Sequence, residues 1–410
     1  MTDLATEPFV FDPFDRDVIS DPLPYYEILR RDHPAYYLPR YDAWVISRFE
    51  DVFEVLADNE GNFVAVEGTV VGQELLEHHN PPGHVPPAPL DPLDKFSRLP
   101  NPVYGDIRHA FGAPLRPRAT QRIEPFVREQ AREAAERARE AGTINLVADY
   151  GGYVAARTMC LLFGIDLDEW RDLLDVVNAY TEKDPDTGAF RPERKSSLDA
   201  FSYETVARRR AAGADGSLPT VDGLINFEYQ GRRLTDEEIV QQLNIVLIGG
   251  SETVPKVVAH GLLELQRHPD QRAAIGTDPD RIAKAFDEIL RYCAPAQWFL
   301  RTVAKPVTVA GRRLEPGQRV IPLNMSANRD EREFPDPDEF RWDREIRRHV
   351  AFGQGMKFCV GAHVARLEGK VLIQEFLRAF PGYRIDETAL YRPPSSFQWG
   401  YMRMPATVAG

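Results

Sequence analysis

The ten residues FGQGMKFCVG, numbered 352 to 361, place Gly353, Gly355 and Gly361 around Cys359, with Lys357 two positions before the cysteine. Glycine tolerates positive φ and lets another group approach the backbone closely, at a cost in conformational entropy. The spacing therefore predicts a loop against which a bulky group presses. The alternative is an ordinary glycine-rich turn before the helical run AHVARLEGKVLIQEFLRAF, with Cys359 as a small buried apolar residue.

Charge and composition exclude several classes of protein. The 410 residues carry a formal net charge of -13, which argues against a nucleic-acid-binding protein, because such proteins present a basic surface. No stretch approaches the roughly 20 consecutive apolar residues of a membrane span, and the acidic start MTDLATEPFVFD lacks the basic region of a signal peptide. We therefore expect a cytoplasmic protein without membrane insertion.

The cysteines and histidines do not form a metal-binding pattern of their own. Cys160, Cys293 and Cys359 are widely separated, which indicates neither a disulfide framework nor a CxxC zinc site. His78 and His79 lie in proline-rich sequence without a second pair of ligands. We predict a solvated loop there, not a metal site.

The pattern along the chain predicts a mainly α protein. The first 65 residues alternate helix-like and strand-like segments, residues 66 to 102 read as a proline-rich loop, and the pattern from about 118 to 300 is overwhelmingly helical. Short strand-like segments return after 300. We find no internal repeat or linker, so we expect a single domain over 1–410, with a mixed α/β portion near 1–65 and a helical body near 104–380.

Residues 234 to 269, LTDEEIVQQLNIVLIGGSETVPKVVAHGLLELQRHP, predict a long central helix. Thr235 and Glu238 have the spacing of a capping box, and Leu234 and Ile239 that of a hydrophobic staple. A helix that reaches Arg267 would span ~48 Å at 1.5 Å per residue. Its apolar positions surround most of the circumference, which predicts burial at the centre of the molecule.

The middle of this helix contains residues that weaken helices. Gly249 and Gly250 each cost roughly 1 kcal/mol in a helix interior and Pro255 costs ~3 kcal/mol. One explanation is a kink that eases packing against a neighbouring helix. The other is a widened groove that admits a small ligand and water beside the carboxylate of Glu252 and the hydroxyl of Thr253.

Glu288 and Arg291, in DEILRYCAPAQWFLR, are three residues apart and so lie on one helix face. The spacing alone is weak evidence, because EILR also occurs at 27 to 30, where an exposed helix pair worth ~0.3 kcal/mol is the simplest reading. The position of Glu288 and Arg291, between the long helix and the cysteine loop, distinguishes them.

The order of four motifs resembles the heme-thiolate monooxygenases of the cytochrome P450 superfamily. Residues 352–361 resemble the heme-binding loop, residues 249–253 the oxygen-binding segment small-Gly-x-acid-Thr, and residues 288–291 the Glu-x-x-Arg motif. VYGDIRHAF resembles the family's His-x-x-x-Arg segment, with Tyr104 in place of the histidine and Arg108 kept. The resemblance implies the cytochrome P450 fold, a helix-rich domain with small peripheral β-sheets.

The resemblance also implies heme b with Cys359 as the axial ligand of its iron, a ligation that favours O–O cleavage. The three glycines would let the loop lie against the porphyrin, and Phe352 would shield the sulfur from water. The candidates for contacts with the heme propionates, by motif position, are Arg108, Arg301, His349, Lys357 and Tyr104.

In this family the acid and the alcohol of the oxygen-binding segment, here Glu252 and Thr253, deliver protons during oxygen activation. Glu288 and Arg291 would belong to a structural network. Its usual third member is an arginine at the position that Glu339 occupies here, and Arg341 follows two residues later. The resemblance leaves the third member open.

The implied reaction inserts one oxygen atom from O2 into a medium-sized apolar organic molecule, such as a terpenoid, aromatic compound or steroid, by hydroxylation or oxidative demethylation. The chain has no flavin, nicotinamide or ferredoxin-like motif, so electrons would come from a separate ferredoxin and an NAD(P)H-dependent reductase. The family's substrate-binding segments correspond to Val246, Gly249, Ala296, Gln297 and Phe397.

Two alternatives use the same cysteine loop. A heme-thiolate peroxygenase would take oxygen from H2O2 without an electron donor, and a heme-binding sensor would catalyse nothing. Glu252 and Thr253 favour the monooxygenase over the peroxygenase, because they belong to dioxygen activation. In the sensor these proton-delivery residues would have no purpose.

Overall fold

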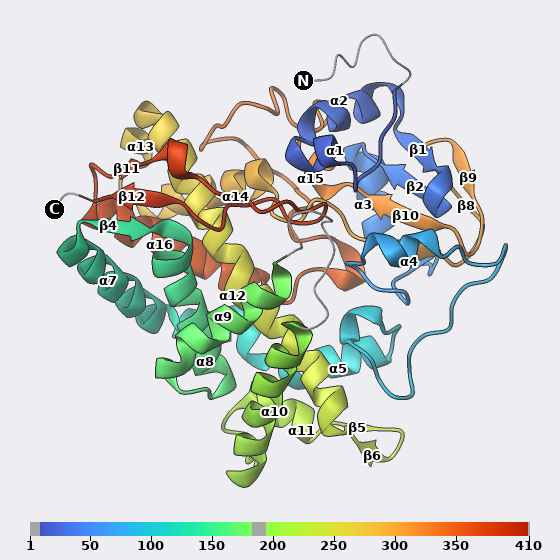
Figure 1. The fold of residues 1–410 in the computed structure, drawn as a ribbon, viewed down its shortest axis with the longest axis horizontal. Helices are drawn as coiled ribbons and strands as arrows, with labels where there is room; N and C mark the ends of the chain where they lie inside the picture. Colours follow the sequence, from blue (N-terminus) through green and yellow to red (C-terminus); the bar gives the residue numbers. More distant parts are fainter. Residues whose placement is uncertain (1–8, 183–193, 409–410) are drawn as a thin grey trace.

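Helix α12 (Asp236–Arg267) runs through the centre of the molecule in the computed structural model, which describes residues 9–182 and 194–408 (Figure 1). The predicted capping box is confirmed: the Thr235 hydroxyl accepts a hydrogen bond from the backbone N–H of Glu238 at 3.2 Å, and the Glu238 carboxylate accepts one from the N–H of Thr235 at 2.8 Å. The helix continues without a break through Gly249, Gly250 and Pro255.

Helices make up most of the described chain, which confirms the predicted fold class. Besides α12, they are α1 (Arg16–Ser20), α2 (Leu23–Asp32), α3 (Phe49–Ala57), α4 (Gln73–Glu77), α5 (Val103–Phe111), α6 (Pro117–Arg122), α7 (Glu124–Ala141), α8 (Tyr153–Phe163), α9 (Trp170–Thr181), α10 (Lys195–Ala211), α11 (Pro219–Ile225), α13 (Pro269–Ile275), α14 (Pro279–Cys293), α15 (Asn324–Ala327) and α16 (Ala362–Ala379).

Small sheets lie beside the helical body (Figure 1). The largest has the order β1-β2-β10-β7-β3, and its strands are β1 (Ala35–Leu38), β2 (Ala43–Ile46), β3 (Phe63–Val64), β7 (Arg301–Val303) and β10 (Arg319–Pro322). A second sheet joins β11 (Arg384–Ile385), β12 (Pro405–Thr407) and β4 (Thr143–Asn145). Two hairpins complete the set, β5 (Glu228–Tyr229) with β6 (Arg232–Arg233) and β8 (Val307–Val309) with β9 (Arg312–Leu314).

The largest sheet joins segments that lie far apart in the sequence. Strand β2 pairs in parallel with β10, with Ala43 opposite Arg319, and β3 pairs with β7, with Phe63 opposite Val303. The strands near the amino terminus therefore have their partners in the last third of the chain.

The core is packed around α12. One apolar cluster unites its carboxyl-terminal half with α7, α14 and α16, and another unites its amino-terminal half with α5, α8 and α11. This central position, predicted from the apolar pattern, holds the middle of α12 in the interior. None of the helices in residues 9–182 and 194–408 has the length and apolar character needed to cross a bilayer.

Candidate active site

The cysteine loop joins a buried segment ending at Val350 to the amino terminus of α16. Its backbone folds back on itself, because the N–H of Cys359 donates to the carbonyl of Phe352 at 2.9 Å. Gly353 and Gly355 have φ of 68° and 63°, which only glycine adopts readily. A Cβ on Gly355 would also lie 2.8 Å from the carbonyl oxygen of Leu56, so this glycine lets the loop rest against the end of α3.

The Cys359 thiol is accessible, although protein surrounds it. Its side chain is exposed, yet burial raises the pKa of the thiol, while the backbone N–H groups of Gly361 and Ala362 and the guanidinium of Arg108 lower it. A side chain that is both accessible and surrounded by protein lies on the wall of an internal space. The N–H groups come from the first turn of α16, where the helix dipole favours a thiolate.

Three cations lie close to this loop without a counter-ion. Arg108, Arg301 and Lys357 form no ion pair with any described residue, although Arg301 is buried and Lys357 is half-buried. Arg108 donates to the carbonyl of Phe358 at 2.6 Å, and Lys357 donates to that of Leu99 at 2.7 Å. Burial lowers the pKa of Arg301 to about 10. Burial, with Arg301 and Arg108 nearby, lowers the pKa of Lys357 to about 7.

Tyr104 and His349 complete the polar groups of this region. Tyr104 is buried, its hydroxyl donates to the carbonyl of Met356 at 2.7 Å, and its ring lies 3.7 Å from the Lys357 ammonium. His349 Nδ1 accepts from the N–H of Ala351 at 3.1 Å, and its buried Nε2, which makes no hydrogen bond, lies 3.8 Å from the Asp287 carboxylate. Cations without a counter-ion are costly in an interior, so Arg108, Arg301 and Lys357 indicate a missing anionic group.

The two neighbouring glycines in the middle of α12 face different surroundings. A Cβ on Gly249 would meet open space, whereas one on Gly250 would collide with Met159 of α8. The two explanations for the glycines therefore apply to different residues: Gly250 serves packing, and Gly249 faces open space. Thr253, one turn after Gly249, is half-buried, and its hydroxyl makes no hydrogen bond with the residues that the structure describes.

Glu252 lies in a buried cluster that the sequence motif did not predict. Its carboxylate is paired with the ammonium of Lys256 and accepts a hydrogen bond from the side-chain amide of Gln398. Lys256 also donates to Gln398 Oε1 at 3.1 Å. The spacing of four residues between Glu252 and Lys256 is a helix-pair signal that could have identified the lysine. Gln398 comes from a distant segment, for which no local signal exists.

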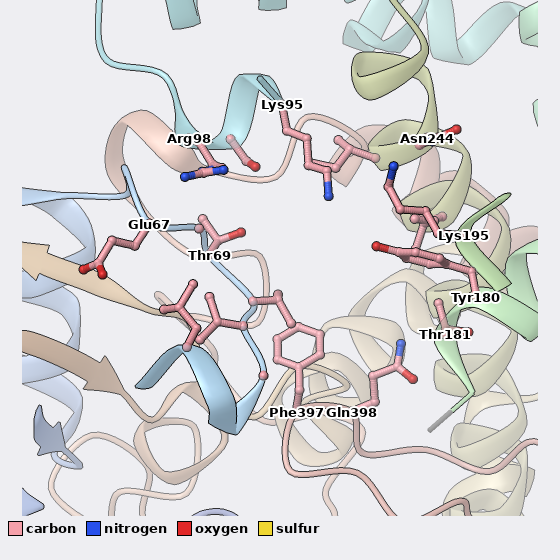
Figure 2. A pocket seen from close by; sticks show the side chains of 18 residues that line it. Glu67, Thr69, Lys95, Arg98, Tyr180, Thr181, Lys195, Asn244, Phe397 and Gln398 are labelled. Atoms are coloured by element: carbon pink, nitrogen blue, oxygen red, sulfur yellow. The ribbon is translucent and has the colours of Figure 1, made fainter. Parts of the chain in front are cut away.

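A cavity of about 450 Å³ extends beside the amino-terminal half of α12 (Figure 2). Phe397, one of the predicted substrate-binding residues, lines it together with Ile245 and Ile248. The other predicted substrate residues, Val246, Gly249, Ala296 and Gln297, do not line this cavity. The side chain of Gln297 instead accepts from Tyr26 at 2.8 Å and donates to the Ser395 carbonyl at 3.1 Å.

Comparison with known proteins identifies the family. The cytochrome P450 family model matches residues 193–389. The putative cytochrome P450 123 of Mycobacterium tuberculosis is 30% identical over 416 residues, which cover 97% of each chain. The chain belongs to the cytochrome P450 superfamily. The solved structure of cytochrome P450 CYP109Q5 from Chondromyces apiculatus superposes with a TM-score of 0.80 at 25% identity and covers 97% of this chain and 98% of that one.

A further relative has a named activity. The steroid C26-monooxygenase of Mycolicibacterium smegmatis is 35% identical over 234 residues, which cover 57% of this chain and 53% of that protein. Cytochromes P450 are oxidoreductases that incorporate oxygen from O2 into organic molecules and bind heme b, and this chain is such an enzyme.

The residues around the cysteine loop fit heme b in this P450. Cys359 presents an accessible thiol whose negative form is favoured by two N–H groups. The two propionates of heme b would supply the negative charge that Arg108, Arg301 and Lys357 lack. The open space beside Gly249 and Gly361, where a Cβ would meet no atom within 4 Å, leaves room on both sides.

Glu288 and Arg291 of the P450 form a fully buried ion pair, with Nε–Oε2 and Nη2–Oε1 distances of 2.6 and 2.8 Å. The third charged member, left open by the sequence, is Arg344, whose Nε lies 3.2 Å from Glu288 Oε1. Glu339 contributes its backbone carbonyl and Arg341 its backbone N–H, which donates to Glu288 at 3.0 Å. The second guanidinium that pairs with Glu288 thus belongs to Arg344, five residues after Glu339, where the family usually has its arginine.

Proposed function

We propose that this P450 is a monooxygenase that hydroxylates or oxidatively demethylates a medium-sized apolar molecule, with heme b held by Cys359. The observation that carries the proposal is the accessible Cys359 thiol beside a cluster of cations without anions. Heme b bound through a cysteine thiolate supplies the activation of O2. Arg108, Arg301 and Lys357 would hold its propionates.

The other residues of the loop complete the heme site in this proposal. Tyr104 and His349 are buried beside the cations and would lie next to the same propionates. The Tyr104 hydroxyl would have to leave the Met356 carbonyl to donate to a propionate, whereas His349 Nε2 makes no hydrogen bond. Gly353, Gly355 and Gly361 shape the loop, and Phe352 covers the sulfur from the other side. Arg366, which is paired with Asp287 at 3.1 Å, lies 4.7 Å from the centre of the Phe352 ring on this side.

Proton delivery is assigned to Thr253 and Glu252. The Thr253 hydroxyl, which has no partner among the described residues, is available to hold a water and pass a proton beside the open space at Gly249. The Glu252 carboxylate is oriented by Lys256 and Gln398, and Gln398 also lines the cavity, so this acid is a fixed acceptor one residue behind it. The two groups together favour O2 over H2O2 as the oxygen source.

Electrons would come from a separate ferredoxin and an NAD(P)H-dependent reductase, since the chain carries no motif for a flavin, a nicotinamide or an iron–sulfur cluster. The substrate would bind along the apolar wall formed by Ile245, Ile248 and Phe397, with Val246, Gly249, Ala296 and Gln297 as neighbouring predicted contacts. The named relative, a steroid C26-monooxygenase, supports an apolar substrate of this size.

The difference spectrum of the reduced protein with CO tests the heme assignment. We expect the band that gives the superfamily its name in the parent, and its loss in Cys359→Ala. Cys160→Ala is the matched control, because Cys160 is buried in the core and burial raises the pKa of its thiol to about 12. A protein that cannot be loaded with heme, or a band that survives in Cys359→Ala, would contradict the assignment.

Turnover separates the monooxygenase from its rivals. With ferredoxin, reductase and NADH we expect a product that carries one oxygen atom from labelled O2. Efficient turnover with H2O2 alone, and none with the electron donors, would identify a peroxygenase. The absence of product under both conditions from a panel of apolar substrates would favour the heme-binding sensor.

A further inference from the structure

The cavity beside α12 carries one charge that no described residue neutralises. Four charged side chains line it. Three have partners: Glu67 pairs with Arg319 at 2.7 Å, Lys195 pairs with Asp199 at 2.8 Å, and Arg98 pairs with Asp94. The fourth is Lys95, whose ammonium forms no ion pair or hydrogen bond within residues 9–182 and 194–408. Once the three partners Arg319, Asp199 and Asp94 are counted with the lining, a net charge of +1 remains, on Lys95.

The ammonium of Lys95 points into the cavity (Figure 2). The hydroxyl of Tyr180 is directed into the same space from another side of the cavity, and Phe397 points into it from below. A lysine on an ordinary protein surface would extend into bulk solvent, whereas Lys95 is half-buried and directed into the cavity. Its direction therefore indicates a ligand group.

The backbone that carries Lys95 is held in place on both sides. The N–H of Leu93 donates to the buried Glu238 of α12 at 2.8 Å, and the N–H of Phe96 donates to Gln242 of the same helix at 2.6 Å. Leu99, a few residues later, accepts the Lys357 hydrogen bond from the cysteine loop. Because its neighbours are fixed to α12, the backbone that carries Lys95 is positioned before a ligand arrives, so only the side chain has to be ordered on binding.

The remainder of the lining is mainly apolar and leads toward the proposed reaction site. Val70, Val71 and Leu75 form one wall, and Ile245 and Ile248 form another. Ile248 is followed directly by Gly249, where a Cβ would meet open space. A molecule that extends from Lys95 along the isoleucines would thus bring its far end toward Gly249 and Thr253.

We propose that the substrate is an apolar molecule with a single carboxylate, which binds Lys95 while the apolar body extends along Ile245 and Ile248 toward Gly249. A single anion matches the single unpaired charge, and a neutral ligand would leave the ammonium without a partner in a half-buried setting. This inference rests on the proposed function, because it assigns the substrate class of the same enzyme. A straight-chain fatty acid and a fused-ring steroid acid share this chemistry.

Calorimetric titration of the heme-loaded enzyme tests the inference in two arms. The first compares dodecanoic acid with dodecanol, and the second compares lithocholic acid with its methyl ester, all at neutral pH. We expect the acid to bind about tenfold more tightly than its neutral partner in at least one arm, the fold-change typical of one hydrogen bond to a charged group. The arm that shows the preference identifies the shape of the apolar body.

Variants of Lys95 locate the preference. Lys95→Met should remove it, and Lys95→Arg should keep most of it. Lys284→Met removes a lysine of α14 that is paired with Glu345, far from Lys95 in sequence. This control should leave the preference for the acid unchanged. Equal binding of acid and neutral partner in both arms, or a preference that survives in Lys95→Met, would overturn the proposal.

The CO difference spectrum, recorded on the same preparations, keeps the two conclusions separate. A parent protein without the thiolate band would refute the proposed function, while calorimetry, which needs no turnover, would still decide whether Lys95 selects a carboxylate. A normal band with no preference for the acid would refute the substrate class alone.

Discussion

Replacement of Arg344 by methionine is the perturbation for which the structure predicts the largest loss of stability. Arg344 is buried and donates to the carbonyls of Asp336 and Glu339 at 2.9 and 2.8 Å, besides its 3.2 Å contact with Glu288. Methionine keeps much of the side-chain volume but removes the guanidinium. Among the described residues, Glu288 would keep Arg291 as its only charged partner, and the part-buried carbonyls of Asp336 and Glu339 would lose the Arg344 donor.

The size of the effect follows from these contacts. Breaking a buried ion pair by removing one partner costs about 3–5 kcal/mol, and each carbonyl left without a donor adds about 1 kcal/mol or more. Because Glu288 keeps Arg291, the lower end of the ion-pair range applies. With the two carbonyls added, we expect Arg344→Met to lower the free energy of unfolding by about 5 kcal/mol, a large part of the roughly 5–15 kcal/mol typical of folded proteins. Arg344→Lys, which keeps the charge but not the planar set of donors, should lose roughly half as much.

Urea unfolding of the heme-loaded enzyme, followed by circular dichroism, measures these differences. Arg341→Met is the matched control, because the Arg341 side chain is exposed and its 3.7 Å pair with Asp336 is worth less than about 1 kcal/mol. If Arg344→Met proves too unstable to purify, the ranking of Arg344→Lys against Arg341→Met decides. A loss in Arg341→Met equal to that of either Arg344 variant would refute the assignment of Arg344 as the third member.

Three further predictions concern α12 and α16. Gly249→Ala should raise the free energy of unfolding by up to about 1 kcal/mol, and with it the urea midpoint, because the added Cβ meets open space. Gly250→Ala should lower the midpoint, because its Cβ would collide with Met159 of α8. Burial raises the pKa of Glu368 to about 8, so the folded state retains a proton that the unfolded chain releases near pH 4.5; the free energy of unfolding should fall as pH rises through this window, and Glu368→Gln should remove the slope. Thr253→Ala should leave the CO band intact but reduce product formed per NADH consumed, by roughly tenfold or more, while Ser251→Ala, whose hydroxyl has no partner among the described residues, should couple as the parent does.

Local features of this chain were readable from the sequence. The capping box that starts α12 and the Glu288–Arg291 pair depend on residues three positions apart, and any helix of that sequence brings them together. The glycine pattern of the cysteine loop could be interpreted for a similar reason, since the ability to adopt positive φ is a property of glycine itself. The order of such local signals was enough to indicate the family and the cofactor.

The tertiary structure alone decided which distant groups meet. Arg344 replaces an arginine expected five residues earlier, Gln398 reaches Glu252 from the carboxyl-terminal segment, and the parallel pairing of Ala43 with Arg319 closes the largest sheet. The unpaired charge of Lys95 is of the same kind, because it depends on every neighbour that could have supplied a carboxylate. Backbone geometry fixes contacts within a helical turn, whereas contacts between segments hundreds of residues apart depend on how all the intervening elements pack.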